Sequence, residues 1–375
     1  MSMVFDSVKK LGFGCMRLPM IGDEVDIPQT SRMVDLFLEG GFNYFDTAHG
    51  YISGKSESAI KECLSSRYPR EAYILCNKLS SPHFNREADL APLFESQLEA
   101  CGVDYFDVYL LHAMDKEKFE KYKRCRAYDF ALDLKRRGLI RHLGMSFHDN
   151  AEVLDEILTE FTEIEVVQIQ LNYVDWYDSA VDSKRVYEVC LKHRKPIIIM
   201  EPVKGGALAN LDGEAKAIFS SLGDMSDASY AIRYAAGKPG VFMVLSGMGN
   251  MDMMLDNTSY MKEFAPLDER EAAAVERVSA ILRSQNKDTI PCTGCEYCTE
   301  VCPRGVKIPI AFASLNAKGN FGGFIPSHYY QVRTADGGAA SECIGCGRCE
   351  AVCPQHLEIR KLLTLAVEAF EGAEE

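Results

Sequence analysis

The sequence has no apolar run of the roughly 18 to 20 residues that a membrane-spanning helix requires. Its first ten residues, which include two lysines and one aspartate, also lack the apolar core of a secretory signal peptide. We therefore expect a cytoplasmic protein that has no membrane partner.

The chain also has fewer basic than acidic residues. The chain has 41 Lys and Arg against 55 Asp and Glu, a formal net charge of −14 in 375 residues. Such a surface repels a phosphate backbone, so the composition argues against a nucleic-acid partner. With 47% hydrophobic and 26% charged residues, the composition is that of a globular protein long enough to bury a large core.

The chain contains 14 cysteines but lacks the distribution typical of a small, disulfide-rich secreted protein. Eight of them fall in two tight clusters after residue 290. The other six stand singly, and we expect them to pack as small hydrophobic side chains: Cys15, Cys63, Cys76, Cys101, Cys125 and Cys190. The clustered cysteines, in contrast, indicate a chemical role.

Short apolar runs alternate with amphipathic stretches up to about residue 265, a pattern typical of βα units in a parallel sheet. The eight expected strands are 11–18, 43–48, 72–79, 106–112, 141–147, 166–172, 196–201 and 242–247. Helices are expected between them, for example over 56–66, 90–101 and 151–161. Eight such units predict a (β/α)8 TIM barrel, whose active site lies at the carboxyl ends of the strands. The rival is an open doubly wound sheet, but the segment Gly12–Arg17 lacks the third glycine of its phosphate-binding turn.

The composition changes after a further expected helix over 268–283. From about residue 285 onward the chain is rich in Cys, Gly and Pro, and a last amphipathic helix is expected over 359–371. We therefore expect two domains, a barrel over 1–284 and a smaller domain over 285–375.

The clustered cysteines form two runs, 292–303 and 343–354, that share the spacing C-x2-C-x2-C-x3-C-P. This spacing lets three thiolates surround one face of an iron–sulfur cube. A pair of zinc sites is the alternative, because C-x2-C is also a zinc knuckle, but two matching four-cysteine runs with trailing prolines favour 4Fe-4S clusters. The candidate ligands are Cys292, Cys295, Cys298, Cys302, Cys343, Cys346, Cys349 and Cys353.

The two runs resemble those of two-cluster ferredoxins, in which the fourth cysteine of each run binds the other cluster. The resemblance implies a small α+β ferredoxin-like domain with two 4Fe-4S clusters. It assigns one cluster to Cys292, Cys295, Cys298 and Cys353, and the other to Cys343, Cys346, Cys349 and Cys302. The segment 304–342 between the runs is longer than a minimal ferredoxin needs, and we expect a helix and a loop there that reach toward the barrel.

Four polar side chains stand at or just after expected strand ends: Asp46, Tyr51, Lys78 and His112. A tyrosine beside a lysine can donate a proton at neutral pH, because the cation favours the phenolate and lowers the pKa of the phenol. An aspartate paired with the lysine would fix its position, and the histidine would orient a carbonyl group. This combination suits the reduction of a carbonyl.

The segment Asp46-Thr-Ala-His-Gly-Tyr51-Ile-Ser-Gly-Lys-Ser-Glu57 and the order Asp46, Tyr51, Lys78, His112 resemble the aldo/keto reductase superfamily over about residues 8–265. The resemblance implies that Tyr51 is the general acid, that Lys78 and Asp46 tune it, and that His112 orients the substrate. With its cysteine-rich tail, the whole chain resembles the subgroup that carries a C-terminal 4Fe-4S domain.

The same resemblance implies a nicotinamide cofactor. Ser146 and Gln168 match the residues that hold its carboxamide, and the cofactor-binding candidate Asn172 lies farther along the same strand as Gln168. Asn257 matches a position near the adenine. After the seventh expected strand, Lys204, Gly205 and Gly206 would approach the pyrophosphate, and Gly247 begins a segment at the end of the eighth.

Two departures bear on which cofactor binds. Met200 stands where many family members place an aromatic ring, and residues 247–254 contain no Lys or Arg for the 2′-phosphate of NADPH. NADH, NADPH and a flavin therefore all stay open.

We expect an oxidoreductase that reduces a carbonyl or oxidises the matching alcohol, with a ferredoxin or flavoprotein as its electron partner. A nicotinamide transfers two electrons together, whereas a 4Fe-4S cluster transfers one at a time, so a direct exchange between them is unfavourable. The alternative is an electron-transfer or redox-sensing protein whose barrel is a docking scaffold or binds flavin.

Overall fold

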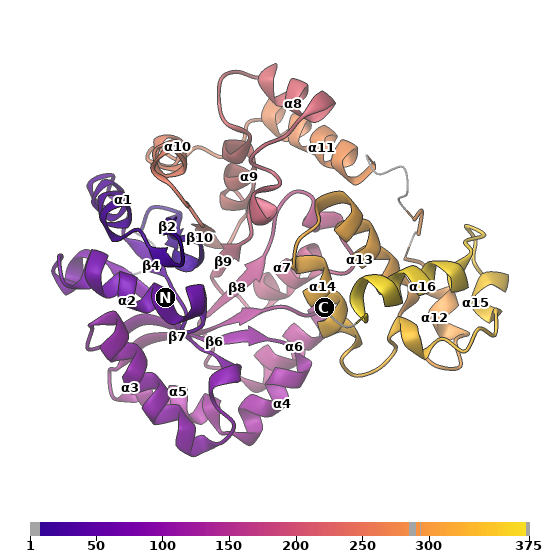
Figure 1. Cartoon of the computed structure of the whole chain (residues 1–375), viewed down its shortest axis with the longest axis horizontal. Coiled ribbons are helices and arrows are strands. Elements are labelled where there is room, and N and C mark those ends of the chain that lie inside the picture. Colours follow the sequence, from indigo (N-terminus) through magenta and orange to yellow (C-terminus); the bar gives the residue numbers. More distant parts are fainter. Residues whose placement is uncertain (1–7, 285–289, 293, 373–375) are drawn as a thin grey trace.

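The computed structural model describes residues 8–284, 290–292 and 294–372, without the side chains of residues 320 and 321. Eight parallel strands close into a barrel in the order β1-β10-β9-β8-β7-β6-β5-β4, and helices surround it (Figure 1). The strands are β1 (Leu11–Gly14), β4 (Tyr44–Asp46), β5 (Ile74–Leu79), β6 (Phe106–Met114), β7 (Ile140–Phe147), β8 (Val166–Gln170), β9 (Ile197–Met200) and β10 (Val241–Ser246). Each overlaps an expected strand, so the predicted TIM barrel is confirmed.

The helices of the barrel begin where the strand-end loops provide a cap. Asp26, Asp115 and Asn150 each accept a hydrogen bond from the backbone N–H three residues ahead, which satisfies an otherwise unpaired donor. The helices are α1 (Ile27–Glu39), α2 (Lys55–Ile60), α3 (Leu90–Cys101), α4 (Lys116–Arg124), α5 (Ala127–Arg136), α6 (Ala151–Glu160), α7 (Ser183–Lys192), α8 (Gly213–Ser220), α9 (Asp227–Ala236), α10 (Met251–Met261) and α11 (Glu269–Ser284). The first expected strand, 11–18, was too long, because β1 ends at Gly14 and a 3-10 segment, Cys15–Arg17, follows it. A small hairpin, β2 (Met20–Ile21) and β3 (Glu24–Val25), comes next.

The inside of the barrel is a packed core. Alternate residues of the strands point inward and form one cluster of buried side chains: Tyr44, Cys76, Val108, Leu110, Val166, Ile198, Phe242, Met243 and Leu245. A larger cluster fills the space between the strands and the surrounding helices. The six scattered cysteines are buried and unpaired, as expected of packing residues.

The C-terminal domain is built around its own hydrophobic cluster, which includes Phe312, Tyr330, Ile359 and Phe370. Its helices are α12 (Tyr297–Glu300), α13 (Ile308–Phe321), α14 (Ile325–Thr334), α15 (Arg348–Ala351) and α16 (Ile359–Phe370). The expected α+β domain shows only helices and turns in the part of it that the structure describes. The cysteine loops turn through left-handed residues such as Gly294 and Gly345, which keeps them out of an extended strand ladder.

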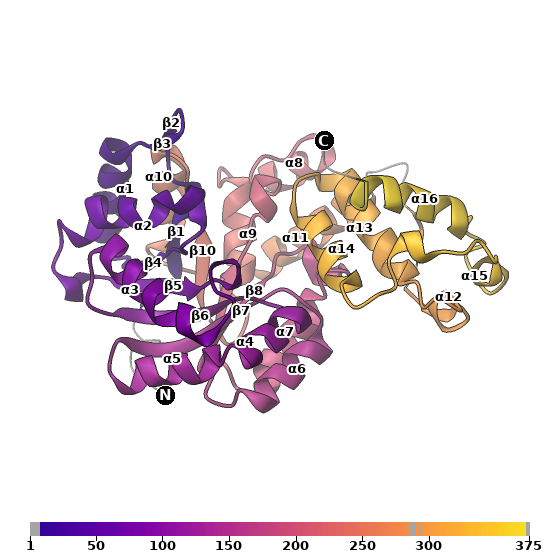
Figure 2. The same ribbon diagram turned by 60° about the horizontal axis from the view of Figure 1, so that its bottom comes forward.

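Helix α14 lies against the barrel, whereas α12 and α15 lie at the far end of the domain (Figures 1 and 2). Arg333 of α14 pairs with Asp149 of the barrel at 3.5 Å, and both side chains are largely buried. The expected contact between the segment 304–342 and the barrel is confirmed. The predicted domain boundary after residue 284 adjoins residues 285–289, which lie outside the described part of the chain.

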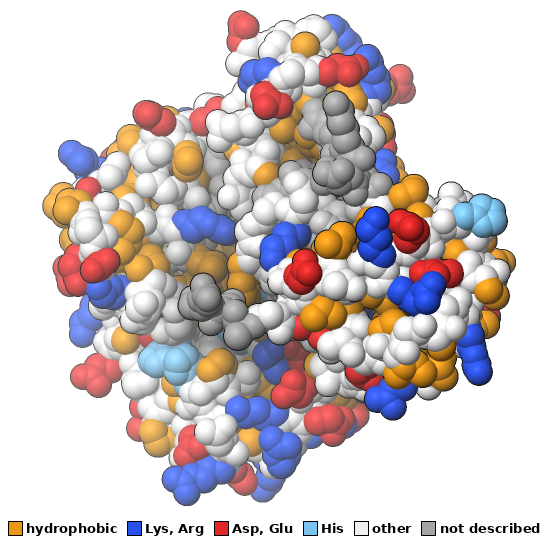
Figure 3. Space-filling view, turned by 45° about the vertical axis from the view of Figure 1, so that its right-hand side comes forward, with side chains coloured by type: hydrophobic (Ala, Val, Ile, Leu, Met, Phe, Trp, Pro, Cys, Tyr) orange, Lys and Arg blue, Asp and Glu red, His pale blue; other side chains and the backbone are white. Residues whose placement is uncertain are grey.

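The surface carries acidic and basic side chains interspersed with hydrophobic ones over both domains (Figure 3). Among the described residues, no helix is both long enough and apolar enough to cross a bilayer.

Candidate active site

The four predicted catalytic residues come from adjacent strand ends. Asp46 ends β4, Lys78 lies one residue before the end of β5, and His112 lies in the last part of β6. Because β4 pairs with β5 and β5 with β6, these side chains meet at one edge of the barrel. Tyr51 follows β4 in the short 3-10 segment Tyr51–Gly54, where Ile52 and Ser53 have positive φ and turn the chain back.

Lys78 and Asp46 form a buried ion pair. The Lys78 ammonium donates to the Asp46 carboxylate at 2.6 Å and to the carbonyl of Thr47 at 2.8 Å. The two side chains are 0% and 3% exposed. Burial, the largest single effect, lowers the pKa of Lys78, but the charge of and hydrogen bond to Asp46, together with Tyr51 and Cys76, outweigh it, so the pKa is raised overall. The ammonium therefore stays charged in a place where a lone cation would not.

Tyr51 lies beside this pair. The Lys78 nitrogen is 4.6 Å from the centre of the Tyr51 ring. Burial raises the pKa of Tyr51 and the charge of Lys78 opposes it, with a net rise. The expectation of a lowered pKa is therefore wrong for the free protein. Removing the phenolate from water destabilises it by more than the charge of Lys78, which is already paired with Asp46, stabilises it. The phenol keeps its proton at neutral pH. When it gives up that proton, the Lys78 ammonium is close enough to stabilise the phenolate.

His112 completes the group. Its ring centre is 6.0 Å from that of Tyr51, and its Nδ1 is 2.5 Å from the Ser80 hydroxyl. Burial, followed by the charge of Lys78, holds the pKa of His112 well below its usual value. The ring is neutral at pH 7, and if Ser80 donates to Nδ1, the proton sits on Nε2.

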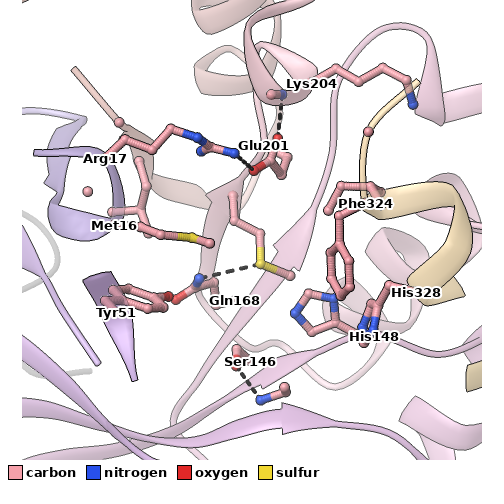
Figure 4. A pocket seen from close by; sticks show the side chains of 18 of the residues that line it. Met16, Arg17, Tyr51, Ser146, His148, Gln168, Glu201, Lys204, Phe324 and His328 are labelled. Atoms are coloured by element: carbon pink, nitrogen blue, oxygen red, sulfur yellow. Dashed lines mark hydrogen bonds and ion pairs between the residues drawn. The ribbon is translucent and has the colours of Figure 1, made fainter. Parts of the chain in front are cut away.

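These residues border a cavity of about 680 Å³ at the carboxyl ends of the strands, shown in Figure 4. Eight of the predicted site residues line it: Asp46, Tyr51, His112, Ser146, Gln168, Lys204, Gly205 and Gly247. Lys78 lies behind this lining, in contact with Asp46 and the Tyr51 ring.

Ser146 and Gln168 face the middle of the cavity. The Ser146 hydroxyl oxygen accepts the backbone N–H of Ala113 at 2.7 Å, which leaves its own proton to donate. Gln168 Nε2 is 3.5 Å from the sulfur of Met200, and its Oε1 is buried without a partner in the described structure. An amide group is the natural partner for these two side chains.

The loop after β9 folds back on itself. Glu201, Lys204, Gly205 and Gly206 all have φ between +48° and +104°. The Gly205 N–H donates to the Glu201 carboxylate, and Lys204 pairs with the buried Asp175. The backbone donor expected to face a pyrophosphate is thus occupied by a carboxylate.

Three predicted cofactor residues lie outside the cavity lining. Asn172 donates to the Asp175 carboxylate at 2.6 Å and to the Glu201 carbonyl at 3.1 Å, so it shapes the loop. Asn257 donates to Ser246 at 2.7 Å and accepts from Tyr260 at 2.8 Å. Gly206 is the last residue of the short 3-10 segment that begins at Lys204.

The sequence analysis missed an ion pair across the cavity. Arg17, just after β1, reaches Glu201 after β9 at 3.2 Å, and Figure 4 shows this bridge beside Met16. The side-chain carbons of Arg17 also pack against Gly247, at the start of the 247–254 segment. The place of Arg17 just after β1 was the available signal, but no motif marked it.

The C-terminal domain also contributes to the cavity, which no sequence pattern indicated. The turn between α13 and α14 and the start of α14 supply Gly322, Gly323, Phe324, Ile325, Pro326 and His328 to its lining. They lie next to His148, which follows β7.

The eight clustered cysteines border two cavities of the C-terminal domain. One is lined by Cys292, Cys295, Cys298 and Cys353, the other by Cys302, Cys343, Cys346 and Cys349. Each cavity therefore takes three cysteines from one run and one from the other. All eight are free of disulfides, and no three His, Cys, Asp or Glu side chains in the described ranges are grouped to hold a single metal ion. The residues present fit a polynuclear cluster with thiolate ligands.

Comparison with known proteins finds two family models that match successive parts of the chain. Residues 10–280 match the family model of the aldo/keto reductases, and residues 291–358 match that of a 4Fe-4S dicluster domain. An uncharacterized oxidoreductase of Schizosaccharomyces pombe is 26% identical over 290 residues, which are 70% of this chain and 86% of that protein. An aldo-keto reductase of Mycolicibacterium smegmatis is 29% identical over 144 residues, or 38% of this chain and 46% of that protein.

Solved structures share the barrel fold. An aldo-keto reductase from Klebsiella pneumoniae in complex with NADPH matches with a TM-score of 0.57 at 18% identity, over 72% of this chain and 91% of that one. The holo form of an aldo-keto reductase from Bacillus halodurans matches with a TM-score of 0.58 at 24% identity, over 72% and 92%. The chain therefore belongs to the aldo/keto reductase family, as an oxidoreductase whose barrel is followed by a 4Fe-4S domain.

Proposed function

We propose that the barrel reduces the carbonyl group of a small molecule, or oxidises the matching alcohol, with a nicotinamide cofactor. The observation that carries this proposal is the buried Asp46–Lys78 pair directly beside the Tyr51 phenol. That arrangement holds a proton at the cavity wall and stabilises the charge left when the proton departs.

In the proposed reaction, Tyr51 gives its proton to the carbonyl oxygen. The hydride for the carbonyl carbon would come from a reduced nicotinamide held by Ser146 and Gln168, which would make the alcohol the product. Lys78 stabilises the Tyr51 phenolate until a proton returns from water. His112, being neutral, donates a hydrogen bond to the same oxygen from Nε2 and orients the carbonyl without adding charge.

Ser146 and Gln168 would hold the carboxamide of the cofactor. The buried, unpartnered Oε1 of Gln168 and the free proton of Ser146 support this role, since an amide offers both a donor and an acceptor. A pyrophosphate at Gly205 would require the Glu201 carboxylate to turn away, and Arg17 already pairs with that carboxylate on its other side. Asn172 would act through the loop rather than by contact, and Asn257 through Ser246.

A binding experiment distinguishes NADH, NADPH and flavin as the cofactor. Arg17 beside Gly247 provides a cation that the 247–254 segment lacks. Titration of the purified, cluster-loaded protein with NADH, NADPH and FMN should give tight binding of a nicotinamide. A protein whose barrel is only a docking scaffold would bind none of them tightly.

We also propose that the 285–375 domain holds two 4Fe-4S clusters. The two four-cysteine cavities support the ligand sets implied by the ferredoxin resemblance, with Cys353 and Cys302 exchanged between the runs. The short helices α12 and α15, which carry Cys298 and Cys349, lie at the end of the domain away from the barrel. The clusters would therefore exchange electrons with a ferredoxin or flavoprotein partner rather than directly with the substrate.

The test of the carbonyl reaction is Tyr51→Phe in protein purified without oxygen. We expect a loss of about 10²- to 10⁴-fold in kcat, because the proton donor is gone, with iron and sulfide contents unchanged. Tyr177→Phe is the matched control, since that hydroxyl bonds to Glu276 at 2.7 Å on the surface, and it should keep full activity. Unchanged turnover in Tyr51→Phe would refute the assigned acid.

A further inference from the structure

The C-terminal domain builds one wall of the candidate active-site cavity. Residues 322–326 and His328 line it, and the chain turns there through Gly322 and Gly323, both with positive φ. Figure 4 shows Phe324, His328 and His148 together, on the side of the cavity opposite Tyr51. We call these three side chains the aromatic wall.

The three rings of this wall contact one another in a row, with His328 in the middle. Phe324 stacks on His328 with ring centres 5.4 Å apart and an interplanar angle of 23°. His328 meets His148 at 5.2 Å in an edge-to-face arrangement. Yet Phe324 is 71% exposed. Since burial of a phenylalanine ring is strongly favourable, a ring left open at a cavity offers its surface to a ligand.

The charged groups around the cavity are already paired. Arg17 pairs with Glu201, and Lys204 with Asp175. Burial lowers the pKa of His148 and of His328, so both rings are neutral at pH 7. A charged substrate would lose its water without gaining a partner here, whereas a flat, uncharged ring would gain stacking contacts.

The wall is held in place from both domains. Arg333 of α14 pairs with Asp149 at 3.5 Å and also donates to the Ser179 carbonyl at 3.4 Å. One turn earlier in α14, Tyr330 stacks on Phe370 inside the C-terminal core, with ring centres 4.6 Å apart. Helix α14 therefore carries the wall at a fixed place relative to Tyr51.

We propose that Phe324 and His328 of the iron–sulfur domain, with His148 of the barrel, bind the ring of an uncharged aromatic aldehyde or ketone. This inference rests on the proposed carbonyl reduction and names its substrate class. Phe324 and His328 are then specificity-determining residues, and the 4Fe-4S domain is part of the substrate site as well as a carrier of clusters.

The test compares two aldehydes of the same carbon skeleton, benzaldehyde and cyclohexanecarbaldehyde, in the full-length, cluster-loaded enzyme. Phe324→Ala should lower kcat/KM for benzaldehyde about three- to tenfold, through KM, and change cyclohexanecarbaldehyde less than about twofold. Phe324→Tyr keeps the ring and should keep the preference. Leu365→Ala on α16, a control at another exposed apolar side chain, should change neither. An equal loss for both aldehydes in Phe324→Ala would overturn the proposal.

A second measurement does not depend on turnover. Calorimetric titration with benzyl alcohol should show binding to the wild-type holoenzyme that weakens about three- to tenfold in Phe324→Ala. If the enzyme reduces neither aldehyde but this difference is found, the proposed reaction fails and the aromatic wall stands. If benzyl alcohol binds both proteins equally, or neither, the wall is not a ring-binding site.

Discussion

Two opposite effects, burial and the charge of Lys78, set the pKa of Tyr51. Burial holds the proton on the phenol, and the ammonium of Lys78, 4.6 Å from the ring centre, favours its release. Lys78 itself stays charged because Asp46 lies 2.6 Å away in the same buried place. The three side chains therefore act as one group, and a change at any of them alters the other two.

Lys78→Met tests this balance. The substitution leaves the Asp46 carboxylate buried without its partner, so we expect a loss of about 3–5 kcal/mol in the free energy of unfolding. Because Lys78 lowers the pKa of Tyr51 against the effect of burial, its removal should raise that pKa further. Alcohol oxidation, which needs the phenolate, should then become half-maximal at a higher pH.

The double variant Asp46→Asn/Lys78→Met separates stability from chemistry. With both charges removed, most of the stability in urea unfolding should return, while the shift of the pH profile to higher pH should remain. A double variant that regains the wild-type pH profile would show that Lys78 does not tune Tyr51.

Strand β7 packs closely against both of its neighbours at Gly144, which pairs with Leu110 of β6 and with Val166 of β8. A Cβ atom at Gly144 would lie 2.5 Å from Val166 Cγ1, 2.6 Å from Leu110 Cδ2 and 2.7 Å from the Val166 carbonyl oxygen. The same strand carries Ser146 one residue before its end and is followed by His148, so its place in the barrel positions two side chains that line the cavity.

Gly144→Ala should destabilise the protein by about 1–3 kcal/mol, since the added methyl group forces the backbone of β7 and β8 apart. Thermal unfolding of the oxygen-free protein measures the loss. Adding Val166→Ala removes one of the two side-chain clashes, so the double variant should be more stable than the sum of the single effects predicts. Strict additivity of the two losses would argue against the close packing described here.

Across the whole molecule, the two cysteine runs are interlocked although about 40 residues lie between them. Each four-cysteine cavity joins the first three cysteines of one run to the fourth of the other. With a cluster in each cavity, as proposed, the two runs would hold each other in place, while α14 connects the domain to the barrel. A cluster contributes to folding as well as to electron transfer in such an arrangement.

Cys353→Ser tests the exchange of ligands. The variant should lose the cluster held by the first run, so brief alkylation without oxygen should label Cys292, Cys295 and Cys298 and spare the second run. Peptide mass spectrometry reads the result, and Cys302→Ser should give the mirror image. Labelling of Cys343, Cys346 and Cys349 in Cys353→Ser would mean that each run holds its own cluster.

Much of this protein could be predicted from local sequence pattern. Apolar runs in alternation with amphipathic stretches predicted all eight barrel strands, because burial on both faces imposes that pattern on each strand separately. The order of Asp46, Tyr51, Lys78 and His112 along the chain predicted their meeting, since parallel neighbours end at the same edge. Cysteine spacing predicted the iron–sulfur domain, because one short loop must wrap one face of a cluster.

The remaining features arise from contacts between segments far apart in the chain, which no local pattern encodes. The net rise in the Tyr51 pKa depends on how much water the folded cavity excludes. The Arg17–Glu201 bridge joins the loops after β1 and β9, about 180 residues apart in the chain, and Arg333 pairs with Asp149 where α14 brings Phe324 to the cavity. Sequence spacing fixes what a residue can do to its near neighbours along the chain. Burial, and contact between distant segments, exist only once the chain has folded.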